Sequence, residues 1–303
     1  MNTAPSSPGR QALQRFRSNR WAVAGLIFLL WATALSVFVP WMLAIDPNQG
    51  SDSPFTAPDG RHWMGTDIHG RDLFSRVMIG TRISLMVGAV GAGVSLIIGV
   101  GWGLVAGWRG GRTDAWMMRS VDVLYALPTV VWVMLTLTLF ETRCVLWLSE
   151  RWPSSIPAFR LAAMMVSLGS VSWLTMARVV RAQVLSLRER PFILAAQSIG
   201  VPPVRLMLRH LLPNLVGVIL VYLTLTVPAV VLYESFLSFL GLGIRPPQAS
   251  LGTLIADGAS QLNPVRVRWW LLVFPAGLMA LLLAALNAMG EGLRSAFEPR
   301  DED

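Results

Sequence analysis

Six long apolar runs constrain the fold of this chain more than any other feature of its sequence. Each has about the 20 residues, or more, that a helix needs to cross a bilayer. The first would be roughly 36 Å long as a helix, enough to span with some tilt and too long for the core of a cleaved signal peptide. The runs therefore predict an all-α, polytopic membrane protein with six transmembrane helices. They cover approximately residues 21–44, 83–108, 116–140, 159–180, 215–240 and 269–289.

The charged residues support this class and argue against several others. They make up only 14% of the chain, well below the share of about a quarter in soluble domains. All 25 basic residues are arginines, so the chain lacks the lysine of a phosphate-binding P-loop and the amine of a Schiff base. Because the arginines flank the apolar runs and form no single stripe, no nucleic-acid partner is expected. No metal site is expected either, because the histidines and the cysteine lie outside the predicted spans without metal-ligand spacing: His62, His69, His210 and Cys144.

The arginines also predict the orientation. Residues 1–20 carry four arginines and no acidic residue, which is typical of a segment that stays in the cytoplasm. Counting spans from there puts 15 arginines inside and 10 outside, so we expect a multi-pass protein of the cytoplasmic (inner) membrane with both termini inside. The expected parts are a cytoplasmic tail, a first helix with an external segment, a transmembrane domain and a second cytoplasmic tail. Their boundaries are 1–20, 21–81, 82–291 and 292–303.

Residues 191–214, PFILAAQSIGVPPVRLMLRHLLPN, predict a hairpin of two short helices between the fourth and fifth runs. Pro191 suits the first position of a helix, Gly200 ends it, and the two prolines that follow cannot continue it. A surface that docks a partner protein and a connecting loop that packs on its own membrane domain explain this pattern equally well. Four small or apolar residues share one face by their spacing: Phe192, Ala195, Ala196 and Ile199.

Two ionisable residues fall inside the predicted spans, where a charge costs about 2.5–3.5 kcal/mol. Asp122 lies one turn from Arg119 near the end of its run, so we expect a local ion pair there. Glu234 lies deeper in its predicted span than Asp122 does, and the sequence leaves open whether it faces a solute path, a partner helix or another span. Both residues are therefore candidates to face a path or a partner.

Small residues and prolines make further predictions about the spans. In the second run, glycine recurs every fourth residue at Gly99, Gly103 and Gly107, a spacing that lets helix backbones approach closely in lipid. Prolines inside other runs predict kinks or local openings of those helices. They are Pro128, Pro228 and Pro275.

Several classes of membrane protein fit the chain poorly. A proton-driven secondary transporter commonly carries a chain of acidic or histidine groups at the membrane midplane, whereas two isolated carboxylates occur here. An intramembrane hydrolase needs a nucleophile with a base, and no histidine lies in any predicted span. The composition does not exclude a channel subunit, but this alternative does not explain the hairpin. A permease driven by a separate motor protein accounts for both the hairpin and the missing P-loop.

The hairpin carries a family signature. Leu194-Ala195-Ala196, Gly200 and His210-Leu211-Leu212-Pro213 are similar to the Glu-Ala-Ala, Gly and Ile-x-Leu-Pro elements of the inner-membrane permease subunits of binding-protein-dependent ABC importers. The resemblance implies a type I ABC importer transmembrane domain whose cytoplasmic loop, residues 181–214, holds a coupling helix that docks on an ATP-hydrolysing subunit. Leu194 replaces the family's glutamate. The docking residues that the family resemblance implies are Phe192, Leu194, Ala195, Ala196, Gln197, Ile199, Gly200, Arg209, His210 and Pro213.

Other blocks narrow the resemblance to oligopeptide, dipeptide and nickel permeases. The block GTDIHGRDLFSR looks like the motif before the second span in those permeases. It also fits a turn that leads into an interfacial amphipathic helix with Phe74, Val77 and Met78, while a contact with an external binding protein is the functional alternative. Residues 172–192 are most similar to the second (C-type) permease subunit of oligopeptide importers. Three further blocks are similar to the same group of permeases: residues 234–243, 246–252 and 290–299.

The resemblance implies a multi-subunit transporter in which this chain is not an enzyme. The chain would pair with a homologous second permease and two ATP-binding subunits, and an external substrate-binding protein would deliver the solute. ATP would bind the partner subunits, and this chain would bind no cofactor. Peptides, oligopeptides first, are the implied substrates. A channel or secondary-transporter subunit for a small solute is the alternative.

Overall fold

The computed structural model describes residues 8–43, 49–246, 248–262 and 266–297. Within these ranges the chain forms helices and loops but no strand, and Thr66 and Asp72 pair in an isolated bridge. A 3₁₀ turn at Pro153–Ser155 and a π-helical turn at Met207–Leu211 supplement the α-helices. These α-helices are α1 Pro8–Ser18, α2 Arg20–Leu43, α3 Leu73–Arg109, α4 Gly111–Tyr125, α5 Thr129–Arg151, α6 Ile156–Arg188, α7 Pro191–Ser198, α8 Pro203–Leu206, α9 Leu212–Phe239, α10 Leu251–Ser260 and α11 Trp270–Phe297.

Six of the described helical segments are long and apolar enough to cross a membrane, which confirms the predicted all-α class with six spans. They are Arg20–Pro40, Leu73–Arg109, Thr129–Arg151, Pro153–Arg188, Pro203–Phe239 and Trp270–Phe297, so the fifth includes α8 and the π-helical turn together with α9. The predicted first run reaches residue 44, which lies outside the described residues, as do parts of both predicted tails.

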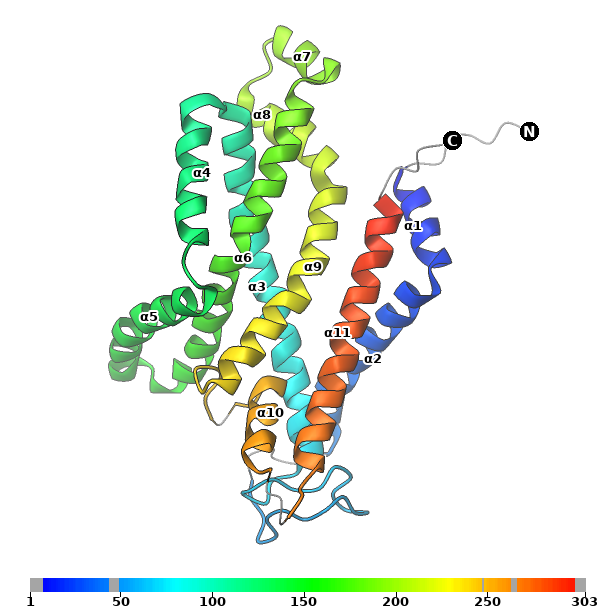
Figure 1. Ribbon diagram of the computed structural model, residues 1–303, viewed down its shortest axis with the longest axis vertical. Coiled ribbons are helices and arrows are strands. Elements are labelled where there is room, and N and C mark those ends of the chain that lie inside the picture. Colours follow the sequence, from blue (N-terminus) through cyan, green and yellow to red (C-terminus); the bar gives the residue numbers. More distant parts are fainter. Residues whose placement is uncertain (1–7, 44–48, 247, 263–265, 298–303) are drawn as a thin grey trace, which may run out of the picture.

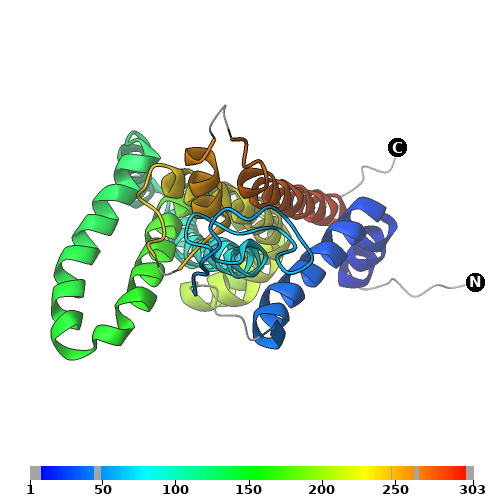
Figure 2. The ribbon, with the colours of Figure 1, turned by 90° about the horizontal axis from the view of Figure 1, so that it is seen from below.

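The long helices lie side by side, and the two ends of the bundle differ (Figure 1). One end, called the hairpin end below, carries α7, the start of α1 and the end of α11. The opposite end, called the loop end, carries residues 49–72 and α10. Seen from the loop end, α5 extends away from the centre on one side, while α1 and α2 lie on the other (Figure 2). The bundle is therefore a row of helices with α3 and α9 at its centre.

Close contact between α3 and α6 forms the centre of the row. A Cβ atom added to Gly103 would lie 2.6 Å from the Ala177 carbonyl oxygen and 2.8 Å from Val180 Cβ. Gly99 and Gly107 approach α6 as closely, because their added Cβ atoms would lie within 3 Å of Met176 and Val184. The glycine spacing in the sequence therefore marks a real close approach of two backbones.

The second span begins ten residues before its predicted start, so the predicted boundary at 82 falls inside a continuous helix. Asp72 caps α3 by accepting a hydrogen bond from the Ser75 amide at 2.9 Å. The first turns of α3 are buried because Leu73, Val77 and Met78 pack in a cluster with residues of α2, α10 and α11. The block therefore leads through a turn into the span itself, and the prediction of a separate interfacial helix is wrong.

The predicted third span is also wrong in its bounds. α4 ends at Tyr125, Pro128 follows, and a new helix, α5, begins at Thr129 and continues to Arg151. The span is α5, so Cys144, which was expected in a connecting segment, lies inside a candidate span. Proline cannot donate to the preceding turn, and at this position the chain breaks rather than kinks. By contrast, the prolines of α9 and α11 stay inside continuous helices: Pro228 and Pro275.

The close approach of α3 and α6 predicts a position-specific loss of stability. Gly103→Leu should lower the free energy of unfolding by about 1–3 kcal/mol, because the added side chain meets backbone that has no room to move. Thermal unfolding of the solubilised protein measures the change.

Gly101→Leu is the matched control on the same helix. An added Cβ at Gly101 meets nothing within 4 Å, so this variant should change stability by no more than about 0.5 kcal/mol in the destabilising direction. Equal losses in the two variants would contradict the close packing of α3 on α6.

Candidate functional site

The hairpin between α6 and α9 has the two-helix form that its sequence predicts. α7 starts with Pro191 at its first position, and α8 starts with Pro203 in the same way. Gly200 has φ of +79°, a conformation that favours glycine, and it closes α7. The amides of Gly200 and Val201 then donate to the carbonyls of Gln197 and Ala196, at 2.9 and 3.2 Å. The turn between the helices is therefore built by residues that the sequence singles out.

One face of the hairpin packs on the protein itself. Ile193, Leu206 and Leu211 are completely or almost completely buried, in one cluster with residues of α3, α6 and α9. Ala196 belongs to this inner face, because only 7% of its surface is exposed. The predicted common face with Ile199 is therefore wrong, and the docking role of Ala196 stays a prediction. Helical spacing placed it with Ile199, but the turn that begins after α7 carries Ile199 to the opposite side.

The other face of the hairpin is apolar and exposed. Ile199 is 81% exposed, and four further large apolar residues accompany it. We call these residues the outer apolar face: Phe192, Leu194, Ile199, Val204 and Leu208. Of the other residues predicted to dock, His210 is half-buried, and the rest are exposed: Ala195, Gln197, Gly200, Arg209 and Pro213. The hairpin thus combines both sequence interpretations: its inner face packs on the same chain, and its outer face is exposed to a possible partner.

The hairpin continues directly from the α3–α6 pair. α6 extends to Arg188, so residues 181–188 of the predicted loop belong to the helix, and the connection to α7 is only two residues long. The Arg188 side chain donates to the Gly107 carbonyl at 3.2 Å, which ties the end of α6 to the end of α3. The hairpin is therefore joined to a pair of helices whose ends are linked to each other.

Polar contacts fasten α4 along α6. Arg181 binds Asp114 through two hydrogen bonds of 2.5 Å each. Closer to the middle of α6, Arg178 binds Asp122 at 2.7 Å. The expected pair of Asp122 with Arg119 is therefore wrong, because the partner comes from another helix. Asp122 belongs to α4, which lies outside the candidate spans, and its carboxylate is exposed.

Glu234 lies inside the subunit against another span. Its side chain is fully buried, and it accepts hydrogen bonds from Ser238 at 2.7 Å and from Ser84 of α3 at 3.3 Å. Ser84 in turn accepts a bond from the Leu251 amide at 3.2 Å, at the start of α10. Of the three positions that the sequence left open, the structure shows the contact with another span. Glu234 therefore links α9 to α3 and α10.

At the loop end, the block GTDIHGRD folds around Asp67. One carboxylate oxygen accepts from the amides of His69 and Arg71 at 2.8 and 2.9 Å, and the other binds Arg76 at 2.5 Å. Arg76 is itself buried and extends toward Asp257 of α10, with 4.0 Å between the charged atoms. Burial raises the pKa of the Asp257 carboxyl, and the Arg76 charge opposes this shift. Asp67 therefore organises residues 49–72 over the start of α3.

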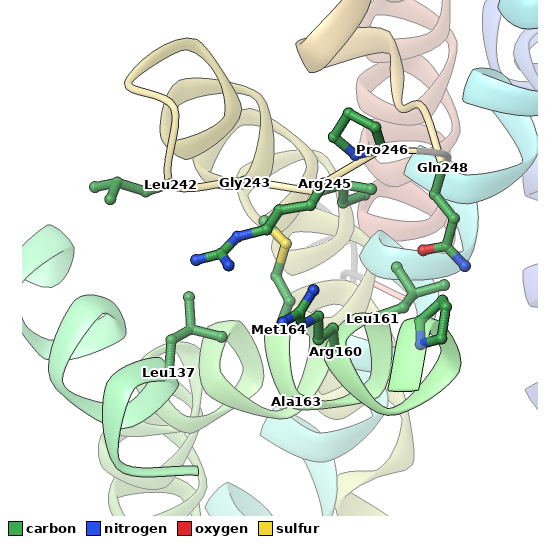
Figure 3. Close-up of a pocket in the computed structure, with 12 residues that line it drawn as sticks. Leu137, Arg160, Leu161, Ala163, Met164, Leu242, Gly243, Arg245, Pro246 and Gln248 are labelled. Carbon is green, nitrogen blue, oxygen red and sulfur yellow. The ribbon is translucent and has the colours of Figure 1, made fainter. Parts of the chain in front are cut away.

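Hollows on the surface of the described residues include the following three. One, of about 310 Å³, lies at the loop end beside Asp67 and α10. A small one, of about 70 Å³, lies between α5, α6 and the loop after α9, where Arg245 reaches over Arg160 and Met164 of α6 (Figure 3). A third, of about 300 Å³, lies between the α4–α5 connection, α6 and α9. Among the described residues, no group of three or more His, Cys, Asp or Glu side chains is placed to hold a metal ion.

Because Asp67 is buried and paired with Arg76, its removal should loosen the structure only at the loop end. Asp67→Ala leaves Arg76 buried without this partner, a change that costs about 3–5 kcal/mol in comparable pairs. The segment should then open, and trypsin added on the loop side should cut several-fold faster after Arg61 or Arg71. Asp52→Ala, which changes an exposed carboxylate of the same segment, should leave the cutting rate unchanged. Unchanged cutting in Asp67→Ala would refute this role.

Comparison with known proteins agrees with this geometry. Residues 99–301 match the family described as "Binding-protein-dependent transport system inner membrane component", and residues 7–58 match the "N-terminal TM domain of oligopeptide transport permease C". The oligopeptide transport system permease protein OppC of Haemophilus influenzae is 40% identical over 96% of this chain and 88% of its own length. OppC of Salmonella typhimurium is 44% identical over 96% of this chain and 91% of its own.

A dipeptide permease is similar as well. The dipeptide transport system permease protein DppC of Bacillus subtilis is 39% identical over 96% of this chain and 85% of its own length. The family match covers α4 to α11, including the hairpin, and the second match covers α1 and α2. This chain therefore belongs to the inner-membrane permease components of binding-protein-dependent ABC importers, among the C-type oligopeptide permeases.

Proposed function

We propose that this chain is the permease subunit of an ATP-driven importer and forms part of the path by which peptides, oligopeptides foremost, cross the cytoplasmic membrane. The observation that carries the proposal is the outer apolar face of the hairpin, which the rest of the described chain leaves exposed. Exposed apolar surface of this kind marks a protein contact. Relatives named as oligopeptide and dipeptide permeases supply the solute class.

The proposed partners follow from the faces of the bundle. Two ATP-binding subunits act in the cytoplasm, and one of them receives the hairpin in a groove. The hairpin end and both termini therefore face the cytoplasm. The loop end, with its organised external segment and the hollow beside α10, faces the substrate-binding protein. A homologous second permease pairs with this chain in the membrane. ATP binds the partner subunits and does not touch this chain.

The packing explains how force reaches the path. When the ATP-binding subunits close and reopen, they move the outer face of the hairpin. The inner face transmits the movement because Ile193 and Leu206 are locked into the cluster shared by α3, α6 and α9. α6 carries α4 with it through the Asp114–Arg181 and Asp122–Arg178 pairs. The subunit thus opens alternately to each side of the membrane.

Replacing an outer residue should uncouple transport. Ile199→Glu places a charge where an apolar contact is proposed, so ATP-driven peptide uptake by the assembled transporter should fall at least about tenfold, the effect of about 1.4 kcal/mol in docking affinity. Co-purification of the ATP-binding subunits should weaken in parallel. Leu13→Glu is the control, because Leu13 is an exposed apolar residue of α1 at the same end. Normal uptake by Ile199→Glu would overturn the proposed docking.

Leu194, the position that departs from the family signature, provides a test in which uptake should be retained. Leu194 is half-exposed on the outer face, and Leu194→Glu restores the signature residue there. This variant should keep peptide uptake, since the family residue fits the same groove. A loss as large as that of Ile199→Glu would show that this chain docks differently from the family.

A channel subunit is the second candidate, and solute flux separates the two. Liposomes that contain this chain and its second permease, without ATP-binding subunits, should show no peptide flux down a gradient. Addition of the ATP-binding subunits, the binding protein and ATP should start uptake. Flux without the ATP-binding subunits would favour the channel.

A further inference from the structure

The cleft of about 300 Å³ between the α4–α5 connection, α6 and α9 lies at the middle of the helices. Ser172, on its wall, is the central residue of α6, and Thr226 is at the centre of α9. Both helices belong to candidate membrane spans. The cleft therefore lies between two membrane-spanning helices, beside the start of α5.

The lining of the cleft is rich in hydroxyl groups and carries no charge. The chain has three tyrosines, and all three line the cleft: Tyr125, Tyr222 and Tyr233. Four more hydroxyls accompany them, from Thr129, Ser172, Thr175 and Thr226, and the remaining lining residues are aliphatic. Tyr233 is 41% exposed, so this surface is accessible in the isolated chain. Polar groups on membrane-spanning helices rarely face lipid and commonly mark a solute pathway.

Polar contacts bound the cleft toward the hairpin end. The Tyr125 hydroxyl and the Thr175 hydroxyl lie 2.9 Å apart in a hydrogen bond between α4 and α6. One turn closer to the hairpin end, the Arg178 guanidinium lies 4.3 Å from the centre of the Tyr125 ring and also binds Asp122. These contacts hold Tyr125 in place at the cleft rim. The nearest charges are thus paired with each other and lie outside the lining.

We propose that this cleft is the section of the path in which the subunit contacts the main chain of the peptide in transit. This inference rests on the proposed function. A hydroxyl group both donates and accepts hydrogen bonds, as the amide N–H and C=O groups shared by all peptides require. The uncharged walls do not select among side chains. Such weak, distributed contacts also allow release, because a transport path must bind a solute without trapping it.

Cysteine accessibility tests the proposal in the complete transporter, reconstituted with its second permease, ATP-binding subunits and binding protein. In a Cys144→Ser background, Tyr233→Cys and Thr226→Cys place one thiol each in the cleft, and Leu281→Cys places one on an exposed part of α11 away from it. A charged, membrane-impermeant thiol reagent is added from both sides, and a gel shift of this chain measures labelling. The competing solute is a mixture of tetra- and pentapeptides.

The proposal expects fast labelling of both cleft thiols, several-fold slower labelling during peptide transport, and an unreactive Leu281→Cys thiol. Cleft thiols as unreactive as that control would overturn it, because the cleft would then be covered by protein or lipid. Reactive thiols that transported peptide fails to protect would also overturn it. If the unmodified transporter imports no peptide at all, the proposed function fails and the peptide is excluded as occupant, while the labelling still distinguishes a path from a packed interface.

Removal of single hydroxyls provides a second readout. Tyr222→Phe and Tyr233→Phe keep the rings that shape the cleft and remove one hydrogen-bonding group each. Peptide uptake should fall about two- to tenfold at sub-saturating peptide, the effect of one hydrogen bond, while co-purification of the ATP-binding subunits stays normal. Unchanged uptake in the double variant would contradict contact with the peptide main chain.

Discussion

Steric contact between α3 and α6 is the constraint around which the rest of the bundle is arranged. Gly99, Gly103 and Gly107 remove the side chains that would separate the two backbones, and Arg188 joins the helix ends at the hairpin. In lipid, apolar side chains gain little by leaving their surroundings, so such close van der Waals packing is a principal source of helix association. Two long helices thereby form one rigid unit.

Each helix of this unit carries a different part of the proposed machinery. α6 leads into the hairpin and holds α4 through the pairs of Asp114 and Asp122. α3 begins under residues 49–72 and meets α9 and α10 through Ser84 and Glu234. The cleft lies between α6 and α9, so a movement imposed on the hairpin would reach the proposed peptide contacts through a single packed pair of helices. This arrangement explains how energy released on another subunit can change access to a path in this one.

The sequence predicts best what depends on residues close to one another along the chain. The spans follow from their length, the hairpin turn follows from Gly200 and its flanking prolines, and the glycine spacing identifies the close approach on α3. Contacts between distant residues escaped prediction: Arg178 and Asp122 are 56 positions apart, and Ser84 and Glu234 are 150 apart. The inward position of Ala196 was not predicted either, because helical periodicity shows which residues share a face but not what that face contacts. The three tyrosines, polar groups within apolar stretches, were a usable sign of the cleft.

Docking of the hairpin on a separate ATP-hydrolysing subunit is the central claim, and photo-crosslinking tests it most directly. A photo-crosslinking amino acid at position 199, the most exposed of the large apolar residues on the hairpin, is activated in membranes that contain the complete transporter. The account predicts an adduct between this chain and an ATP-binding subunit, and none from the same amino acid at position 281 on α11. An adduct at position 199 with lipid alone, or within this chain alone, would contradict it.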